Sequence, residues 1–175
     1  MSGLLNNDLV ELRALEPTDL DVLYRWENDS DVWTVSGTLT PYSRQAIWKY
    51  LEDNVNNDIY SAGELRLMAM LKPTQEPIGT VDLFHFDPVN NRAELGLLVS
   101  PAHRGNGYAR VMLDLLCEYA CGHLGLRQLY AIITADNEHC LRLFDQYGFS
   151  RSGTLKAWVR QGRVYTDAVI FQHVF

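Results

Sequence analysis

Apolar and polar positions along the chain follow two periods, which predict alternating strands and helices. Apolar residues alternate over 10–14, and short apolar runs cover 65–71, 77–86, 92–100 and 128–134. Runs of this length, bounded by turn residues, are typical of strands with one or both faces buried. The pattern therefore predicts five strands ahead of the C-terminal region.

The first third of the chain also shows helical spacing. Apolar residues three and four apart predict a helix over about 18–27, ended by the polar segment 28–31. A loop of small polar residues, 34–40, then leads to a second helix, for which Ser43 suits the N-cap.

A third helix is predicted over about 110–124. Its polar residues form one narrow stripe of Arg110, Asp114 and Glu118, and the rest is apolar. A helix with so narrow a polar stripe is expected to be mostly buried, which holds its N-terminus rigidly.

The most informative segment lies between the strand at 92–100 and this helix. It reads Arg-Gly-Asn-Gly-Tyr-Ala over 104–109. Two glycines at a strand-to-helix turn let a ligand approach the backbone closely, because neither carries a Cβ atom. The first N–H groups of the helix lack intrahelical partners and carry partial positive charge, which suits phosphate oxygens. Arg104 and Arg110 add full charges, so the turn predicts a pyrophosphate site.

Three phosphate-binding patterns compete here with an ordinary glycine-rich turn. A Walker loop ends in Gly-Lys-Ser/Thr, which is absent, and a dinucleotide fingerprint has a third glycine and directly follows its strand. Here Arg110 stands at the third glycine position, and 101–104 separate the strand from the first glycine. The remaining pattern is Arg/Gln-x-x-Gly-x-Gly/Ala, which Arg104, Gly107 and Ala109 match.

Composition narrows the class of protein. The 175 residues, 47% of them hydrophobic, fit one domain, 1–175, with a sizeable core. A net charge of −7 without a basic run argues against nucleic acid. No apolar stretch reaches the roughly 20 residues of a membrane span, and the first residues show no secretory signal. Three cysteines, an odd number, favour reduced thiols and a cytoplasmic location.

Cys117, Cys121 and His123 are close enough in sequence to suggest a metal site. Zinc takes four ligands, commonly with C-x-x-C spacing, and that spacing is absent. Small buried thiols on an apolar helix explain the cysteines better, so no metal is expected.

The strand at 128–134 is followed by a helix that begins at Asp136 or Asn137 and ends before the Gly-Phe pair 148–149. The order of strand, phosphate turn, helix, strand, Asn-initiated helix and Gly-Phe resembles the GNAT N-acetyltransferases. The motif from 93 to 149 is the most specific part of this resemblance.

The resemblance covers nearly the whole chain, because 9–20 and the last hairpin, 156–170, are similar to the spermidine and ribosomal-protein N-acetyltransferase branch. It implies a single α/β domain with a mixed central sheet flanked by helices on both faces. It also implies that acetyl-CoA is the cosubstrate.

Roles for individual residues follow from the same resemblance. The backbone of Leu97, Leu98 and Val99 would pair with the pantetheine arm as an added strand does. Asn137 and the helix after it would lie along the arm, with Phe144 also beside the cosubstrate. The pyrophosphate would bind the whole turn, which consists of Arg104, Gly105, Asn106, Gly107, Tyr108, Ala109 and Arg110.

Transfer to an amine requires a base, since the amine is mostly protonated at neutral pH. Glu94, at the start of the strand that precedes the turn, is the candidate catalytic base. A structural ion pair with Arg92 or Arg127 is the alternative for this carboxylate. Asp82 and His85 on the neighbouring strand are reserve candidates, for which a structural role is the first expectation.

Many family members carry a Tyr four residues before the glycine of the Gly-Phe pair, where it protonates the leaving thiolate. Phe144 occupies that position here. Tyr147 is expected to pack beside Phe149 instead of reaching the sulfur. The general acid is therefore unassigned: either water serves, or the thiolate leaves unassisted, since a thiol has a pKa of about 8.5.

Aromatic residues gather near the expected acceptor site. Trp26 and Trp48 are expected to be core residues. Trp33 and Tyr42, in or beside the loop 34–40, are the candidate substrate-binding residues, with a core role left open.

In spermidine acetyltransferases an acidic pair precedes a Pro-Tyr ahead of the second helix. Leu39 and Thr40 stand there, before Pro41 and Tyr42, and the loop carries no charge. Distant charges do not compensate, because they are screened within about 8–10 Å. We therefore expect spermidine to be a poor substrate and a less charged amine to be preferred.

The predicted function is direct transfer of an acetyl group from acetyl-CoA to a primary amine, either a small molecule or a peptide N-terminus. A CoA-binding module with weak or no catalysis is the alternative, which Phe144 keeps open. A nucleotide-binding oxidoreductase domain is disfavoured by the spacing of the turn. No nucleic acid or membrane partner is expected, and homo-oligomerisation is left open.

Overall fold

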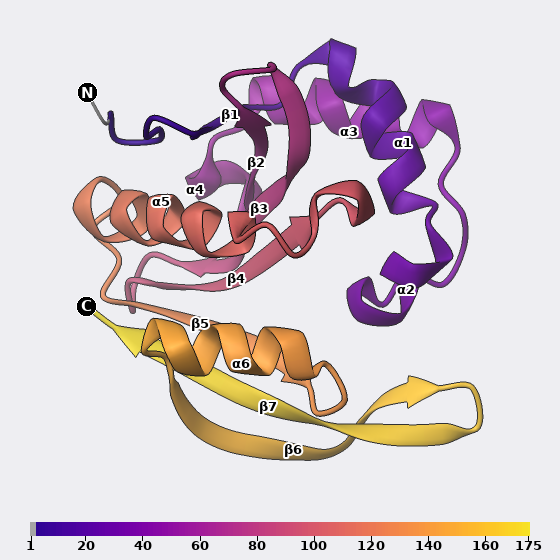
Figure 1. The fold of residues 1–175 in the computed structure, drawn as a ribbon, viewed down its shortest axis with the longest axis vertical. Helices are drawn as coiled ribbons and strands as arrows, with labels where there is room; N and C mark the ends of the chain where they lie inside the picture. Colours follow the sequence, from indigo (N-terminus) through magenta and orange to yellow (C-terminus); the bar gives the residue numbers. More distant parts are fainter. Residues whose placement is uncertain (1–2) are drawn as a thin grey trace.

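The computed structural model describes residues 3–175, apart from the side chains of residues 34 and 35. Met1 and Ser2, which begin the segment expected to lack a signal, lie outside the described residues. Within the described part, one seven-stranded mixed sheet has the order β1-β2-β3-β4-β5-β7-β6 and carries helices on both faces (Figure 1). This is the architecture that the family resemblance implies.

The predicted strands and helices all occur, within a few residues of their expected bounds. The strands are β1 (Val10–Ala14), β2 (Leu65–Leu71), β3 (Glu76–Asp87), β4 (Arg92–Val99), β5 (Gln128–Thr134), β6 (Ser150–Gln161) and β7 (Val164–Val174). The helices are α1 (Leu20–Glu27), α2 (Ser30–Ser36), α3 (Arg44–Asn56), α4 (Ile59–Ala62), α5 (Tyr108–Gly122) and α6 (Glu138–Tyr147), with 3-10 turns η1 (Pro17–Asp19) and η2 (Pro101–His103).

Two short helices, α2 and α4, are missed by the sequence patterns. The carboxylate of Asp29 caps α2, and Gly37, with φ of 72°, ends it. The predicted loop 34–40 is therefore helical at its start, and the polar segment that ends α1 also begins α2. Helix α4 has four residues and is capped by Asp58, which is too short for a helical period to show.

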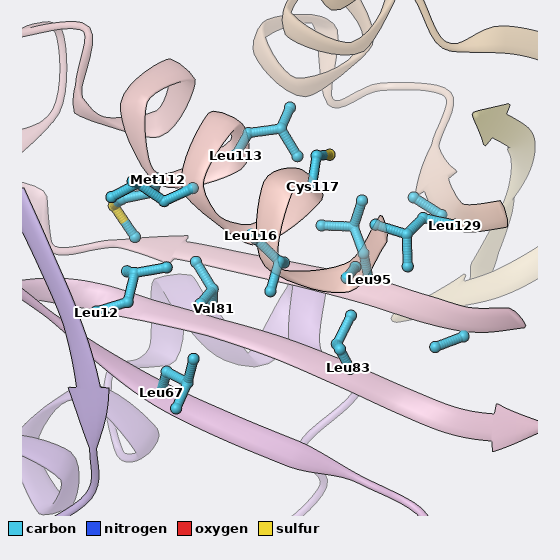
Figure 2. Packing of buried hydrophobic residues seen from close by; sticks show 14 of the residues in the cluster. Leu12, Leu67, Val81, Leu83, Leu95, Met112, Leu113, Leu116, Cys117 and Leu129 are labelled. Atoms are coloured by element: carbon cyan, nitrogen blue, oxygen red, sulfur yellow. The ribbon is translucent and has the colours of Figure 1, made fainter. Parts of the chain in front are cut away.

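Helix α5 packs on one face of the sheet through its apolar surface (Figure 2). Met112, Leu113 and Leu116 are at most 1% exposed, whereas Asp114 and Glu118 are exposed, as the polar stripe predicts. Burying each such apolar side chain stabilises the fold by about 1.5–3 kcal/mol. The N-terminus of α5 is thus held firmly against the sheet.

A smaller apolar cluster joins α1 and α3 to the opposite face. Leu23, Ile47 and Leu51 lie in it, and Trp26 packs against it as expected. The expectation that Trp48 is a core residue is wrong, since Trp48 is 41% exposed. Ile47 and Leu51, four residues apart, define the inward face of α3, and Trp48 lies about 100° around the helix from Ile47.

Candidate active site

The sheet opens between β4 and β5, which are adjacent strands that run parallel to each other. These strands pair over only three residues each, ending at Glu94 and Tyr130. Beyond that point the described strands no longer pair, although β4 continues to Val99 and β5 to Thr134. One edge of β4 is therefore open near the centre of the sheet.

Hydrogen bonding to β3 decides which residues of β4 face this open edge. The amide of Ser100 donates to the carbonyl of Ile78 at 2.9 Å, just beyond the end of the ladder. Bonded pairs alternate along an antiparallel ladder, so Leu98 is bonded to β3. Leu97 and Val99 direct their backbone groups toward the gap. Of the three residues expected to bind pantetheine, Leu97 and Val99 therefore have the required backbone orientation, and Leu98 does not.

The glycine-rich turn follows the open edge of β4 after one 3-10 turn, η2. Gly105 and Gly107 have φ of 79° and 80°, which L side chains rarely adopt, and a Cβ atom at either would meet open space. Gly107 is the N-cap of α5 and provides no side-chain cap. The side-chain amide of Asn106 donates to the carbonyls of His103 and Arg104 at 3.1 and 3.2 Å, which braces the turn.

The start of α6 lies near this turn. Asn137 is the N-cap of α6, and its side-chain oxygen accepts from the amide of Cys140 at 3.2 Å. Burial raises the pKa of the Cys140 thiol, while Asn137 and the charge of Arg104 oppose that shift. Arg104 Nε in turn donates to the carbonyl of Val99 at 3.1 Å. The end of β4, the turn and the start of α6 thus border one region.

Two residues expected to bind the cosubstrate are engaged elsewhere. The Arg110 guanidinium lies 4.8 Å from the centre of the Tyr147 ring, on the α6 side of α5. Phe144 is 3% exposed, and its ring centre lies 4.8 Å from that of Phe149 and 5.6 Å from that of Phe171. Phe144 is a core residue, so its placement argues against the expected contact with the cosubstrate.

Tyr147 packs beside Phe149 with ring centres 5.8 Å apart, as predicted. Its hydroxyl lies beside the Cys117 thiol and the Asp114 carboxylate of α5. Burial, followed by these two groups, raises the pKa of Tyr147. The phenol is engaged with α5, and the general acid remains unassigned.

Glu94 lies where β4 and β5 part, with a side chain 20% exposed. Its Oε2 atom is 2.9 Å from Nδ1 of His85. Arg92 instead pairs with Asp87 at 3.2 Å, and Arg127 bonds the carbonyl of the last residue. Glu94 therefore has an ionisable partner, as the structural alternative expects, but that partner is His85, which a bulge in β3 brings close. The expected pairing with Arg92 or Arg127 is wrong.

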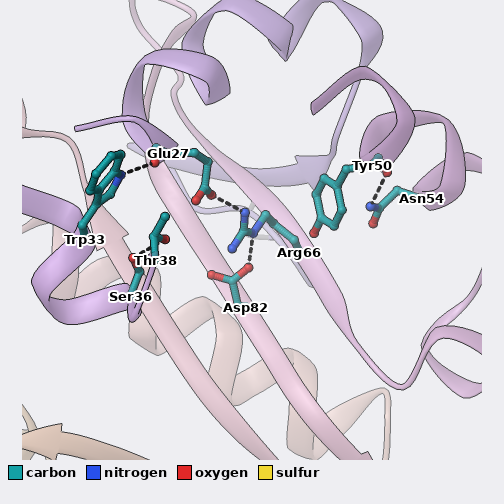
Figure 3. A network of polar contacts seen from close by, with 8 residues as sticks. All are labelled: Glu27, Trp33, Ser36, Thr38, Tyr50, Asn54, Arg66 and Asp82. Atoms are coloured by element: carbon teal, nitrogen blue, oxygen red, sulfur yellow. Dashed lines mark hydrogen bonds and ion pairs between the residues drawn. The ribbon is translucent and has the colours of Figure 1, made fainter. Parts of the chain in front are cut away.

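A buried ionic network lies on the α1–α3 face (Figure 3). Arg66 of β2 donates to Asp82 of β3, and its Nη1 donates to Glu27 of α1 at 2.6 Å. Burial raises the pKa of Asp82, and the adjacent guanidinium opposes that shift. Burial disfavours the charge on Arg66, but Asp82, Tyr50 and Glu27 outweigh it and raise the pKa of Arg66. Asp82 thus has the structural role expected of it.

A pocket of about 230 Å³ opens over this network and is the candidate acceptor site. Its lining comes from α1, α3 and the neighbouring strands and comprises Leu23, Glu27, Tyr42, Ala46, Ile47, Tyr50, Glu64, Arg66 and Phe84. Phe84 lies opposite Glu94 in the register of β3 and β4, so the pocket adjoins the candidate base. Two carboxylates, Glu27 and Glu64, line the pocket together with the Arg66 guanidinium, which pairs with Glu27, and the aromatic rings suit a cation.

The two candidate substrate-binding residues differ in whether they line this pocket. Tyr42 lines the pocket, and its backbone is held by Asn28. Trp33 does not line it, because its indole Nε1 donates to the carbonyl of Glu27 at 2.7 Å (Figure 3). Sequence patterns do not single out Glu64 or Arg66, since both residue types are common on strands that border solvent.

The described residues contain no group of three or more His, Cys, Asp or Glu that could hold a metal ion. Cys117 is buried, as expected, but the same expectation is wrong for Cys121, which lies on the exposed side of α5. In the part of the chain that the structure describes, no helix is long and apolar enough to cross a membrane.

A mixed sheet that parts beside one strand, followed by a glycine turn and a firmly packed helix, defines a CoA-dependent acyltransferase fold. The sequence profile of the acetyltransferase (GNAT) domain matches residues 10–150. The chain belongs to this GNAT family of N-acetyltransferases, as the sequence motif indicated.

Several relatives match almost the full chain. Spermidine N(1)-acetyltransferase of Escherichia coli K12 is 29% identical over 172 residues, 95% of this chain and 88% of the relative. The uncharacterized N-acetyltransferase p20 of Bacillus licheniformis is 26% identical over 167 residues, 95% of this chain and 93% of the relative.

Solved structures confirm the fold. Spermidine N-acetyltransferase from Vibrio cholerae in complex with CoA and spermine has a TM-score of 0.87 at 22% identity, with 96% of each chain covered. A dodecameric structure of the Vibrio cholerae enzyme in an intermediate state has a TM-score of 0.79 at 24% identity, covering 96% of this chain and 95% of that one.

Proposed function

We propose that this protein transfers the acetyl group of acetyl-CoA directly to a primary amine. The observation that carries the proposal is the continuity of Glu94, the open edge of β4 and the uncapped N-terminus of α5. The residues present fit the cosubstrate: Leu97 and Val99 offer backbone groups to an amide-containing arm, and the turn at Gly107 offers N–H groups to a pyrophosphate.

Each part of the site has a role in this reaction. Acetyl-CoA, when bound, supplies the thioester. Arg104 and the backbone of the turn neutralise the pyrophosphate, and β4 orients the arm along the open edge. Glu94 accepts a proton from the acceptor ammonium, which frees the lone pair of the amine for attack. The C–S bond of the thioester breaks as the C–N bond forms, and the departing thiolate takes up the second nitrogen proton through water. The pocket at Tyr42 holds the amine beside this carboxylate.

For the acceptor we infer an amine with one positive charge, such as a peptide N-terminus or a small amino compound. The relatives named spermidine N-acetyltransferases make spermidine the first alternative. However, Glu27 and Asp82 already contact Arg66, which leaves Glu64 as the pocket carboxylate without an ion pair among the described residues. Leu39, at the place of an acidic residue in those enzymes, is 88% exposed and uncharged.

An acceptor screen tests the proposed reaction. Thiol release from acetyl-CoA would be followed with polyamines, amino acids, peptides with free N-termini and aminoglycosides, and products would be checked by mass spectrometry. We expect at least one amine to gain an acetyl group, with Glu94→Gln as the inactive control. Tight binding of CoA without acetylation of any acceptor would contradict the proposal.

That contradicting result would support the second candidate, a CoA-binding module with weak or no catalysis. Phe144 is buried, and it stands at the position where many family members carry the Tyr that acts as general acid, which favours this alternative. We further propose a homo-oligomer, since a similar structure is dodecameric. Light scattering coupled to size-exclusion chromatography would measure the assembly, and a monomer at micromolar concentration would exclude it.

A further inference from the structure

An irregularity in β3 sets the position of His85. The register with β4 shifts between Phe84 and Asp87, where two residues of β3 oppose one residue of β4. His85, within this bulge, has a φ of 47°, which is uncommon for a residue with a Cβ atom. Such strained positions persist only where the surroundings determine them, and they cluster at functional sites.

The bulge directs the imidazole to Glu94. Nδ1 of His85 lies 2.9 Å from Oε2 of Glu94. The carboxylate side chain is 20% exposed, whereas the imidazole side chain is 76% exposed. A hydrogen bond therefore connects a mostly buried carboxylate to a ring that reaches solvent.

A second pocket, of about 410 Å³, opens on the His85 side of the pair. It is separate from the acceptor pocket, which lies on the Phe84 side. Its other titratable groups are Asp87 and Arg92, which pair with each other, and Tyr130, whose pKa is raised by burial, by the charge of Glu94 and by a side-chain hydrogen bond with Glu94. His85 and Tyr130 both contact the candidate base from this pocket. The phenol is partly buried and its pKa is raised, whereas the imidazole side chain is 76% exposed, so His85 is the better placed of the two to exchange a proton with water.

We propose that His85 is a positioning residue that orients Glu94 and carries its proton to solvent through this second pocket. The inference rests on the proposed acetyltransferase function. The amine would enter from one side of Glu94, and the proton would leave from the other. Removal of the proton would regenerate the carboxylate for the next turnover.

The proton that Glu94 takes up is balanced without a further reactant, and the second nitrogen proton, lost as the amide forms, goes to the departing thiolate. Glu94 takes one proton from the acceptor ammonium and becomes a neutral carboxylic acid. A neutral imidazole with its proton on Nε2 accepts that proton at Nδ1 from Oε2, which restores the carboxylate. The imidazolium then releases the Nε2 proton to water, and the exposed ring returns to its first tautomer by exchange with solvent.

Two variants at this position test the proposal in the full-length protein. His85→Asn tolerates a positive φ but cannot relay a proton, and His85→Gly also tolerates it and leaves space for a small base. We expect both to lower kcat by about tenfold or more with little change in KM. Imidazole added to His85→Gly should restore kcat with saturation. Pyrazole, a ring of the same shape and much weaker basicity, should not.

Equal rescue by pyrazole, or unchanged kcat in both variants, would overturn the relay. A double variant with Glu94→Gln gives a further readout. The effect of His85→Asn should disappear in that background, because groups acting in one relay are not additive. Additive losses would show a separate structural role for His85. If the wild-type protein acetylates no amine, the proposed function itself fails, whereas an active wild type with normal His85 variants refutes the relay alone.

Discussion

Arg66 of β2 and Asp82 of β3 stand opposite each other in the register of the two strands and form a buried ion pair beneath the acceptor pocket. Glu27 of α1 bonds the same guanidinium, so the pair also ties a helix to the sheet. Because Asp82 is 4% exposed and occupied by Arg66, we propose Glu94 as the proton acceptor; its register partner Phe84 lines the pocket.

Breaking this network should destabilise the fold. Arg66→Met leaves the buried carboxylate of Asp82 without its counter-charge, and we expect the free energy of unfolding to fall by about 3–5 kcal/mol. Urea denaturation would measure the loss. Arg44→Met, which removes an exposed pair with Asp21, is the matched control and should change stability little. Similar losses in both variants would contradict a stabilising role for the network.

Substitution of the turn glycine should weaken CoA binding. Gly107→Val adds a branched side chain at φ of 80°, beside the N–H groups proposed to bind pyrophosphate. We expect the affinity for CoA to fall by about tenfold or more, or about 1.4 kcal/mol per factor of ten. Gly162→Val, at φ of 65° in the β6–β7 turn, controls for backbone strain and should leave affinity unchanged. Calorimetry showing equal affinity for Gly107→Val and wild type would remove the basis of the site.

Removal of the proposed base should slow transfer strongly at neutral pH. Glu94→Gln keeps the size of the side chain and abolishes proton acceptance, so we expect kcat/KM to fall by roughly 10²–10⁴-fold. The loss should shrink as pH rises, because more of the amine is then already deprotonated. Steady-state rates across the pH range would show this, with Glu118→Gln, on the exposed stripe of α5, as control. Near-normal rates at every pH would assign Glu94 a structural role.

Tyr147 should not act as the general acid. Its hydroxyl is engaged with Cys117 and Asp114, and burial raises its pKa, so Tyr147→Phe should leave kcat nearly unchanged. Transfer rates and thermal unfolding would be measured on the same preparation. A large loss of kcat with normal stability would identify Tyr147 as the missing acid.

Spermidine should be acetylated poorly. The acceptor pocket has little uncompensated negative charge, and a polycation requires carboxylates along its length. We expect kcat/KM for spermidine below about 10⁴ M⁻¹s⁻¹, the lower end of ordinary enzyme efficiency. Leu39→Glu combined with Thr40→Glu should lower KM for spermidine and change that for a singly charged amine less. A high efficiency of the wild type would show that a polyamine site is built from other residues.

Local sequence signals were sufficient to predict most helices and strands and the phosphate turn. The Ser43 cap lies where the sequence predicts it, and Asn137, one of the two residues predicted to begin α6, is its N-cap. Gly107 has the positive φ that a glycine at this turn suggests. The buried face of α5 follows from its narrow polar stripe. These features depend on residues within about one helical turn of one another, so they can be predicted from a single sequence.

Contacts between segments distant in sequence could be identified only from the tertiary structure. The pairing of Glu94 with His85 depends on a bulge in β3. Which of Leu97 and Leu98 turns its backbone groups to the open edge depends on which residue pairs of the β3–β4 ladder are hydrogen-bonded. The burial of Phe144 follows from the packing of α6 on β7. A shift of one residue in strand register would reverse which side chains and backbone groups face the site, and register is set by tertiary packing and irregularities that a residue pattern does not reveal.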